Sequence, residues 1–259
     1  MMKRVFLLLL PLLVPVAVSA QTGDEDTRRW AVDGFIGTAG PMHMKTDGQV
    51  FGSTLPSVRE GFASGVHVEY FLPYAPFSLK AGYEHEELNF VNQDISSTMK
   101  SLSLGGRYYP LPRHWVVQPY TGADLLVNIG AVNDNQSMES YSSSAVRPSY
   151  RREARVRLPR FGAASVVGAD IRMFSSIYLQ MQYSYRLAVG SHVDIRSRAL
   201  SGNGPVSHDH GTLHRHALSI GLKIAFPFRF TTRDGEGLIN LLLDALFPDD
   251  YSHNRIYNR

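Results

Sequence analysis

The chain has 259 residues, of which 44% are hydrophobic, with no cysteine and a formal net charge of +3. Setting aside the basic pair at the N-terminus, Lys3 and Arg4, leaves 24 basic residues (26 − 2) against 23 acidic ones, so the charge does not predict a nucleic-acid partner. The absence of cysteine excludes a disulfide framework, a thiol nucleophile and a cysteine-linked lipid anchor.

The first 20 residues have the pattern of a secretory signal peptide. Lys3 and Arg4 precede an apolar run of 13 residues, Phe6 to Val18, and Val18-Ser19-Ala20 offers a small-residue cleavage site. A spanning helix needs about 20 apolar residues, so an uncleaved anchor is the weaker alternative. We therefore expect an exported chain with three parts: a signal peptide at 1–20, a main domain at 21–230 and a C-terminal tail at 231–259.

Alternation of apolar and polar residues predicts eight β-strands in the main domain. In the last of them Leu218, Ile220, Leu222, Ile224 and Phe226 share one face, while Ser219, Gly221, Lys223 and Ala225 share the other. Such a strand suits either a soluble sandwich or a barrel wall with lipid outside. The expected strands are 29–38, 62–72, 77–88, 98–109, 116–130, 159–173, 177–188 and 215–226.

The connections favour the barrel. Those at 73–76, 110–114 and 174–176 are short, whereas three others are long, at 39–61, 131–158 and 189–214. Short turns at one end and long loops at the other are typical of outer-membrane barrels, whose turns are periplasmic. Aromatic residues also gather beside the short turns, as in an interfacial girdle. They are Tyr70, Phe71, Tyr74, Phe77, Tyr108, Tyr109, Trp115, Phe174 and Tyr178, with Phe226, Phe228 and Phe230 at the end of the last strand. The sequence predicts an all-β fold: an eight-stranded antiparallel transmembrane up-and-down β-barrel with a short C-terminal periplasmic helix.

The interior of such a barrel is only wide enough for side chains to fill it. Strand parity turns charged residues inward, and buried charges must be paired. We expect ion pairs to plug the lumen, so that the protein is not a general porin; an ion or proton path is the alternative. The residues expected in these pairs are Glu69, Lys80, Glu84, Arg107, Asp124, Asp170, Arg172, Arg186 and Lys223, with Asp33, Glu86 and His67 also facing inward.

Three stretches resemble the small outer-membrane β-barrel family of OmpA-like and OmpX-like domains. They are 118–124 (QPYTGAD), 168–172 (GADIR) with 182–186 (QYSYR), and the last strand. The resemblance implies a Gram-negative outer-membrane location, with the N-terminus and the tail in the periplasm and lipopolysaccharide at the outer surface. It also implies that Ser219, Gly221, Ile224 and Phe226 form the signal read by the barrel assembly machinery. It says little about function, because one fold serves many roles.

The chain departs from many of these barrels by continuing for 29 residues (259 − 230) after Phe230. Residues 235–247 are rich in Leu and are too short to span a membrane, so they predict an interfacial or docking helix. That helix either covers the periplasmic mouth of the barrel or binds a periplasmic protein.

Two loops contain candidate binding residues. His208, His210 and His214 carry imidazoles that suit zinc, copper or nickel, but their spacing fixes no geometry, so we expect solvated loop histidines and no cofactor. Arg147, Arg151, Arg152 and Arg155 cluster in the 131–158 loop. Guanidinium groups bind phosphate in a bidentate manner, so these arginines are candidate lipopolysaccharide contacts; a solvated loop is the alternative.

A catalytic role needs a positioned nucleophile and base. Some eight-stranded barrels of the resembling family modify lipid A with a His-x-Ser element, but here Ser207-His208-Asp209 has the wrong order. We expect a non-enzymatic protein with a structural or interaction role through its outer loops or its tail. The alternatives are a lipid-A-modifying enzyme, an accessory barrel for envelope biogenesis or secretion, and a soluble lipocalin-like carrier, which would need an apolar lumen.

Overall fold

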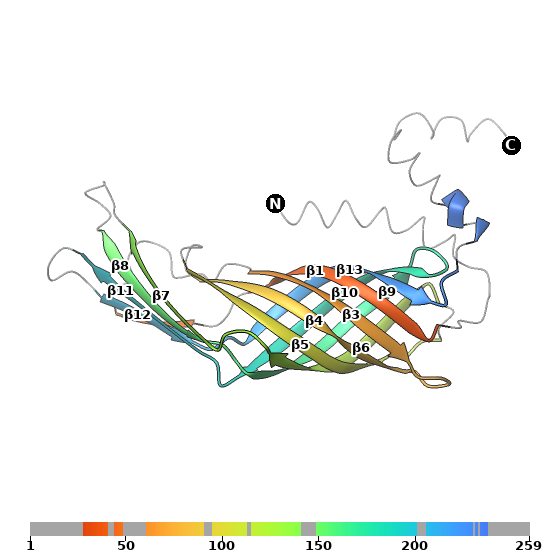
Figure 1. The fold of residues 1–259 in the computed structure, drawn as a ribbon, viewed down its shortest axis with the longest axis horizontal. Coiled ribbons are helices and arrows are strands. Elements are labelled where there is room, and N and C mark those ends of the chain that lie inside the picture. The colour runs from red at the N-terminus through yellow and green to blue at the C-terminus, as the bar shows by residue number, and fades with distance from the viewer. Residues whose placement is uncertain are drawn as a thin grey trace, which may run out of the picture.

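The computed structural model describes residues 28–40, 44–48, 61–90, 95–112, 115–140, 149–200, 206–229, 231–232 and 234–237. Eight strands close into an antiparallel barrel in the order β1-β13-β10-β9-β6-β5-β4-β3 (Figure 1). Their bounds are β1 Trp30–Ala39, β3 Gly61–Phe71, β4 Phe77–Phe90, β5 Ile95–Tyr108, β6 Val117–Asn128, β9 Phe161–Arg172, β10 Ile177–Val189 and β13 Arg215–Phe226.

The predicted fold class is confirmed, and each barrel strand lies within a few residues of its expected range. Closure is direct, because β1 pairs with β13 on one side and with β3 on the other. The buried residues of each barrel strand all lie on one of its two faces, most regularly in β5, where buried and exposed positions alternate from Ile95 to Leu104. The alternation of residue types in the sequence therefore corresponds to side chains that point alternately into the lumen and out of the barrel.

A second sheet of five strands stands at one end of the barrel, in the order β2-β12-β11-β8-β7 (Figure 1). Its strands lie in the three connections that the sequence assigned to loops, so that expectation was wrong. In β8 and β11 a buried, mainly aliphatic series alternates with charged residues on the open face, and this short, charged alternation is easily taken for a polar loop. The bounds are β2 Met44–Gly48, β7 Asn133–Ser140, β8 Tyr150–Arg157, β11 His192–Ala199 and β12 Val206–Gly211.

One apolar cluster fastens the second sheet to the barrel. Leu88 and Phe90 at the end of β4 and Ile95 at the start of β5 pack with residues of β8 and β11, among them Val156 and Ile195. Hydrogen bonds add to this contact, because the Ser97 hydroxyl of β5 donates to Asp134 of β7 at 2.8 Å. The second sheet is thus a folded extension of the barrel rather than a set of independent loops.

The chain leaves the barrel for the second sheet through a tight junction at Gly190. This residue has φ of 69°, a left-handed conformation that side chains with a Cβ rarely adopt. The hydroxyl of Ser191 then donates to Ala188 O at 2.9 Å and accepts from Leu213 N at 3.0 Å. These bonds hold the start of β11 against the segment that returns to β13.

The tail begins at the opposite end of the barrel, beside the turn between β9 and β10. Asp234 accepts hydrogen bonds from the backbone N–H of Thr231 at 2.7 Å and from that of Ser175 in the turn at 3.1 Å. Thr231 Oγ1 in turn accepts from Asp234 N at 3.3 Å, so the two residues form a capping box at a helix start. Residues 234–237 are helical. The predicted signal peptide and most of the predicted helix at 235–247 lie outside the described residues.

Among the described residues, no helix has the length and the apolar character to cross a membrane.

Candidate functional site

The lumen is crossed near the turn end by a four-residue ion-pair group. Lys223 Nζ lies 2.6 Å from both Glu69 Oε2 and Asp170 Oδ2, and it donates to the Tyr109 hydroxyl at 3.2 Å. The Tyr109 hydroxyl is also 2.8 Å from Glu69 Oε1. Glu69 is on β3, Asp170 on β9 and Lys223 on β13, and Tyr109 follows β5 directly, so the group draws on every second strand of the barrel. Side chains from all quarters of the wall therefore meet at the centre.

A second group of buried charges lies further along the lumen from the first, and it consists of Asp33, Lys80, His67 and Glu84. Asp33 accepts from Lys80 Nζ at 3.0 Å and lies 3.0 Å from His67 Nδ1, while His67 Nε2 lies 3.2 Å from Glu84 Oε1. Strand register explains the first contacts, because Asp33 is the direct cross-strand partner of His67. The ring of His67 also stacks on Phe35, with centroids 5.2 Å apart. This group fills one side of the lumen.

Another pair in the lumen joins Arg107 of β5 to Asp124 of β6. The guanidinium of Arg107 donates to both carboxylate oxygens of Asp124, at 2.6 and 2.8 Å, in the planar bidentate geometry that arginine favours. Both residues are buried. They come from neighbouring strands, so this pair braces the wall as well as filling the interior.

A third group closes the lumen toward the second sheet. Arg186 Nη1 of β10 lies 2.7 Å from Glu84 Oε2 and 3.3 Å from Glu86 Oε2, both on β4, which stands opposite β10 in the closed barrel. Arg215 also donates to Glu86. Arg215 was missing from the expected pairs, although strand parity alone would have found it, since it shares the inner face of β13 with Ala217 and Lys223.

Eight of the nine residues expected in lumen ion pairs take part in these contacts. The ninth, Arg172, is half-buried at the turn end of β9, with its guanidinium 5.8 Å from the ring centroid of Tyr178. Three aromatic residues assigned to the girdle, Phe71, Tyr109 and Tyr178, are instead buried. Parity decides this outcome, because they alternate with outward neighbours at the ends of their strands.

The candidate arginines are divided between the two faces of the second sheet. Arg151 and Arg155 lie on its open face, whereas Arg152 is buried on the opposite face. Arg151 is 3.3 Å from Glu153 and 3.7 Å from Glu139. Arg147 lies outside the described residues. Because neighbouring residues of a strand point to opposite faces, these arginines do not form a single cluster.

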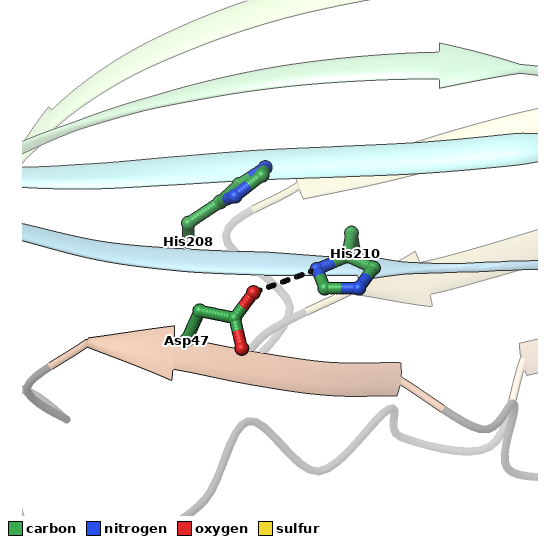
Figure 2. A group of neighbouring side chains, drawn as sticks. All are labelled: Asp47, His208 and His210. Carbon is green, nitrogen blue, oxygen red and sulfur yellow. Dashed lines mark ion pairs between the residues drawn. The ribbon is translucent and has the colours of Figure 1, made fainter.

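Two of the three candidate histidines, His208 and His210, lie on this same open face of the second sheet. His208 and His210 alternate on β12, and Asp47 of β2 is the cross-strand partner of His208 (Figure 2). His210 Nδ1 lies 3.6 Å from Asp47 Oδ2, and His208 Nε2 lies 2.9 Å from Asp194 Oδ2 on β11. Partial burial would raise the pKa of the Asp194 carboxyl, but the hydrogen bond and charge of His208 and the nearby Arg196 lower that pKa below its ordinary value.

His214 lies apart from this group. Its Nδ1 accepts a hydrogen bond from Ala188 N at 3.0 Å, so the ring helps to fix the junction between the barrel and the second sheet. The sequence predicts that His214 is a solvated loop residue, because nothing in the sequence indicates its contact with Ala188.

The four residues of the expected assembly signal lie on β13. Ile224 and Phe226 point outward, at 39% and 41% exposure. Gly221 has a packing role as well, because a Cβ there would meet Gly34 O and lie 3.0 Å from Phe35 Cβ. The glycine thus makes room for the Cα and Cβ of Phe35, the residue whose ring stacks on His67.

The outside of the barrel is a continuous apolar belt. Large residues stand exposed on the strands around the wall, among them Val66, Leu104, Leu125, Val167 and Leu222. At the turn end Trp30, Phe77, Tyr108, Trp115, Phe226 and Phe228 are exposed, and Phe77 packs on Tyr108 with centroids 5.1 Å apart. A charged interior, an apolar belt and an aromatic rim are the features of a wall that faces lipid. The fold and its surface define a small eight-stranded transmembrane β-barrel.

No protein-family model matches the sequence, and no curated protein matches it. Among solved structures, the chain is similar to the outer membrane protein OprG from Pseudomonas aeruginosa, at 12% identity and a TM-score of 0.44, over 77% of this chain and 96% of that one. It is also similar to Neisserial surface protein A, at 16% identity and a TM-score of 0.41, over 76% and 97%. A third similar structure is a major outer membrane protein from Thermus thermophilus, at 14% identity and a TM-score of 0.41, over 77% of this chain and 100% of that one.

Proposed function

We propose that this chain is a non-enzymatic barrel of a Gram-negative outer membrane that holds a folded β-sheet at the cell surface for interaction. The observation that carries the proposal is the Glu69–Lys223–Asp170 group, which crosses the lumen with contacts of 2.6 Å and leaves the barrel as a support rather than a conduit. Buried charges of this kind hold their strands in place and do not form an aqueous channel.

The second sheet is the part of the protein suited to interaction. Its inner face is fixed to the barrel by the apolar cluster, while its open face presents polar and charged side chains such as Arg155, Arg157, Arg196 and Arg198. A rigid scaffold with an exposed polar face is the usual setting for recognition. Exposed guanidinium groups at this end are suited to phosphate groups such as those of lipopolysaccharide.

The proposal includes an orientation. The short links and the tail would lie in the periplasm, and the second sheet outside the cell, as in barrels with short periplasmic turns. During biogenesis β13 would present its terminal signal to the assembly machinery, and the tail at 231–259 would remain available to a periplasmic protein.

The absence of native cysteine allows a sharp test of this orientation. Two variants, Arg155→Cys on the open face of β8 and Ser175→Cys in the β9–β10 turn, each carry one thiol at an exposed position. A membrane-impermeant maleimide applied to intact cells is expected to label Arg155→Cys, and to label Ser175→Cys only after lysis. The reverse pattern would contradict the proposed orientation, and labelling of neither variant in lysed membranes would contradict their exposure.

The non-enzymatic part of the proposal has its own measurement. Lipid A from cells that express the protein and from cells that lack it is expected to have the same acyl chains and phosphate groups by mass spectrometry. Loss or addition of an acyl chain that depends on the protein would replace the interaction role with a lipid-A-modifying one.

A further inference from the structure

We propose that Asp47, His208 and His210 form a binding site for a divalent transition-metal ion, of which zinc is the best example, on the open face of the second sheet. The inference goes beyond the proposed function and does not depend on the orientation of the barrel. It begins with strand geometry, since residues at i and i+2 of one strand lie on the same face. His208 and His210 have this spacing on β12, and their ring centroids are 5.3 Å apart.

The third ligand comes from a distant part of the chain. β2 pairs with β12 so that Asp47 is directly opposite His208 (Figure 2). A ligating atom from each of the three side chains lies within 4.8 Å of the others, and His210 Nδ1 is 3.6 Å from Asp47 Oδ2. Zinc binds nitrogen and oxygen at about 2.0–2.1 Å, so two ligands at a tetrahedral angle are about 3.4 Å apart. Small rotations of these side chains therefore suffice to place all three around one ion.

A fourth residue prepares one of the histidines for this role. Asp194 Oδ2 on β11 lies 2.9 Å from His208 Nε2, which leaves Nδ1 as the nitrogen of His208 that can face a metal. Histidines that bind metals commonly donate their other ring nitrogen to a carboxylate, which fixes the ring and its tautomer. Asp194 is thus a positioning residue rather than a ligand.

The chemistry of the set selects the class of ion. Two imidazoles and one carboxylate suit zinc, nickel and copper(II), whereas calcium and magnesium prefer oxygen ligands alone. The side chain of Asp47 is 72% exposed and those of His208 and His210 are 36% and 33% exposed, so an ion from solution reaches the site and retains water in its remaining positions. Arg196 is the cross-strand partner of His208 and Lys45 that of His210, so both stand on the same face and oppose a cation, which keeps the affinity moderate.

Bound metal would also join β2 to the rest of the sheet. β2 is an edge strand of five residues whose partner in the sheet is β12. An ion held by Asp47 on β2 and by two histidines on β12 would stabilise that pairing in proportion to metal concentration, because it binds the ordered sheet in preference to the open one.

The test is a Zn²⁺ titration by calorimetry of the untagged, full mature chain folded in detergent micelles and first treated with EDTA. We expect one Zn²⁺ per chain. His208→Ala, His210→Ala and Asp47→Asn should each weaken binding at least tenfold, and Asp194→Asn roughly tenfold. The matched control is His85→Ala, which removes another histidine near a carboxylate, 3.9 Å from Glu87, outside the second sheet, and should leave binding unchanged.

A spectroscopic measurement keeps the proposal testable even if a variant disturbs the sheet. Co²⁺ added to the unaltered chain should give the visible d–d absorption of a low-coordinate nitrogen and oxygen site, and Asp194→Asn should shift that band without changing the stoichiometry. The proposal is overturned if the unaltered chain gives no such band or binds no Zn²⁺. It is equally overturned if a His208→Ala/His210→Ala double variant binds Zn²⁺ as tightly as the unaltered chain.

Discussion

Lys223 and Tyr109 form a hydrogen bond of 3.2 Å between the amine and the hydroxyl, although they come from opposite sides of the barrel. β13 and β5 are separated by three strands in either direction around the wall, so this bond spans the lumen. Both side chains are buried, and Glu69 and Asp170 complete the group. The inside of this barrel is therefore a polar core rather than a water-filled passage.

Removal of the central amine is expected to destabilise the protein strongly. Lys223→Met leaves Glu69 and Asp170 buried without their cation, and breaking a buried pair in this way costs about 3–5 kcal/mol. Urea unfolding of the folded protein in lipid vesicles, followed by tryptophan fluorescence, measures the loss. Lys100→Met, at an exposed position of β5, is the matched control and should change the free energy of unfolding by about 0.5 kcal/mol or less.

A triple variant of the same group tests the cause of this loss of stability. Combining Lys223→Met with Glu69→Gln and Asp170→Asn removes the uncompensated charges, so it should recover part of the lost stability. A triple variant less stable than Lys223→Met alone would contradict the assignment of the loss to buried, unpaired carboxylates.

The second sheet should unfold separately from the barrel. Ile195 is fully buried in the cluster that joins the sheet to β4 and β5, so Ile195→Ala should destabilise that contact by about 2–5 kcal/mol. Limited proteolysis should then cleave in the second sheet, within 133–157 or 192–211, while the barrel strands keep their heat-modifiable mobility on gels. Arg198→Ala, three residues away on the open face, should resist proteolysis like the unaltered protein. Equal resistance of Ile195→Ala would contradict the role of the cluster.

The attachment of the tail should depend on pH. Partial burial would raise the pKa of the Asp234 carboxyl, but hydrogen bonds from Thr231 and Ser175 lower it below its ordinary value of 3.8. A carboxyl whose pKa is lower in the folded state stabilises the fold above the unfolded pKa and loses that contribution as the pH falls through the folded one. The carboxyl carbon of Asp234, followed by NMR in micelles, should therefore titrate below pH 3.8. A midpoint above that value would contradict the capping contact.

Much of the barrel was predictable because one physical rule governs it. The period of two that separates Leu222 from Lys223 also separates lipid from lumen, and it placed Glu69, Lys80 and Asp170 inside without any knowledge of their partners. The pairs themselves were not predictable. Which carboxylate meets Lys223 depends on strand order and stagger, and these are properties of the closed barrel.

The second sheet was missed for a related reason. Val193 and Ile195 alternate with charged residues over too few positions to stand out, and their apolar partners, Leu88 and Phe90, come from a strand far away in the sequence. The sequence did not indicate Asp47 as a neighbour of His208 and His210, because these residues lie far apart along the chain. Only the pairing of β2 with β12 brings them together. Long-range pairing is the information that local patterns do not contain.

Conductance across a planar lipid bilayer tests the central claim, a membrane barrel whose lumen is closed by ion pairs, most directly. The folded protein should insert without producing steady channels, because Glu69, Lys223, Asp170 and Tyr109 meet at the centre. A Lys223→Ala/Tyr109→Ala variant that remains folded should conduct more than the unaltered chain, since it lacks the two side chains that span the lumen. A large, stable conductance from the unaltered protein, unchanged in that variant, would contradict the account.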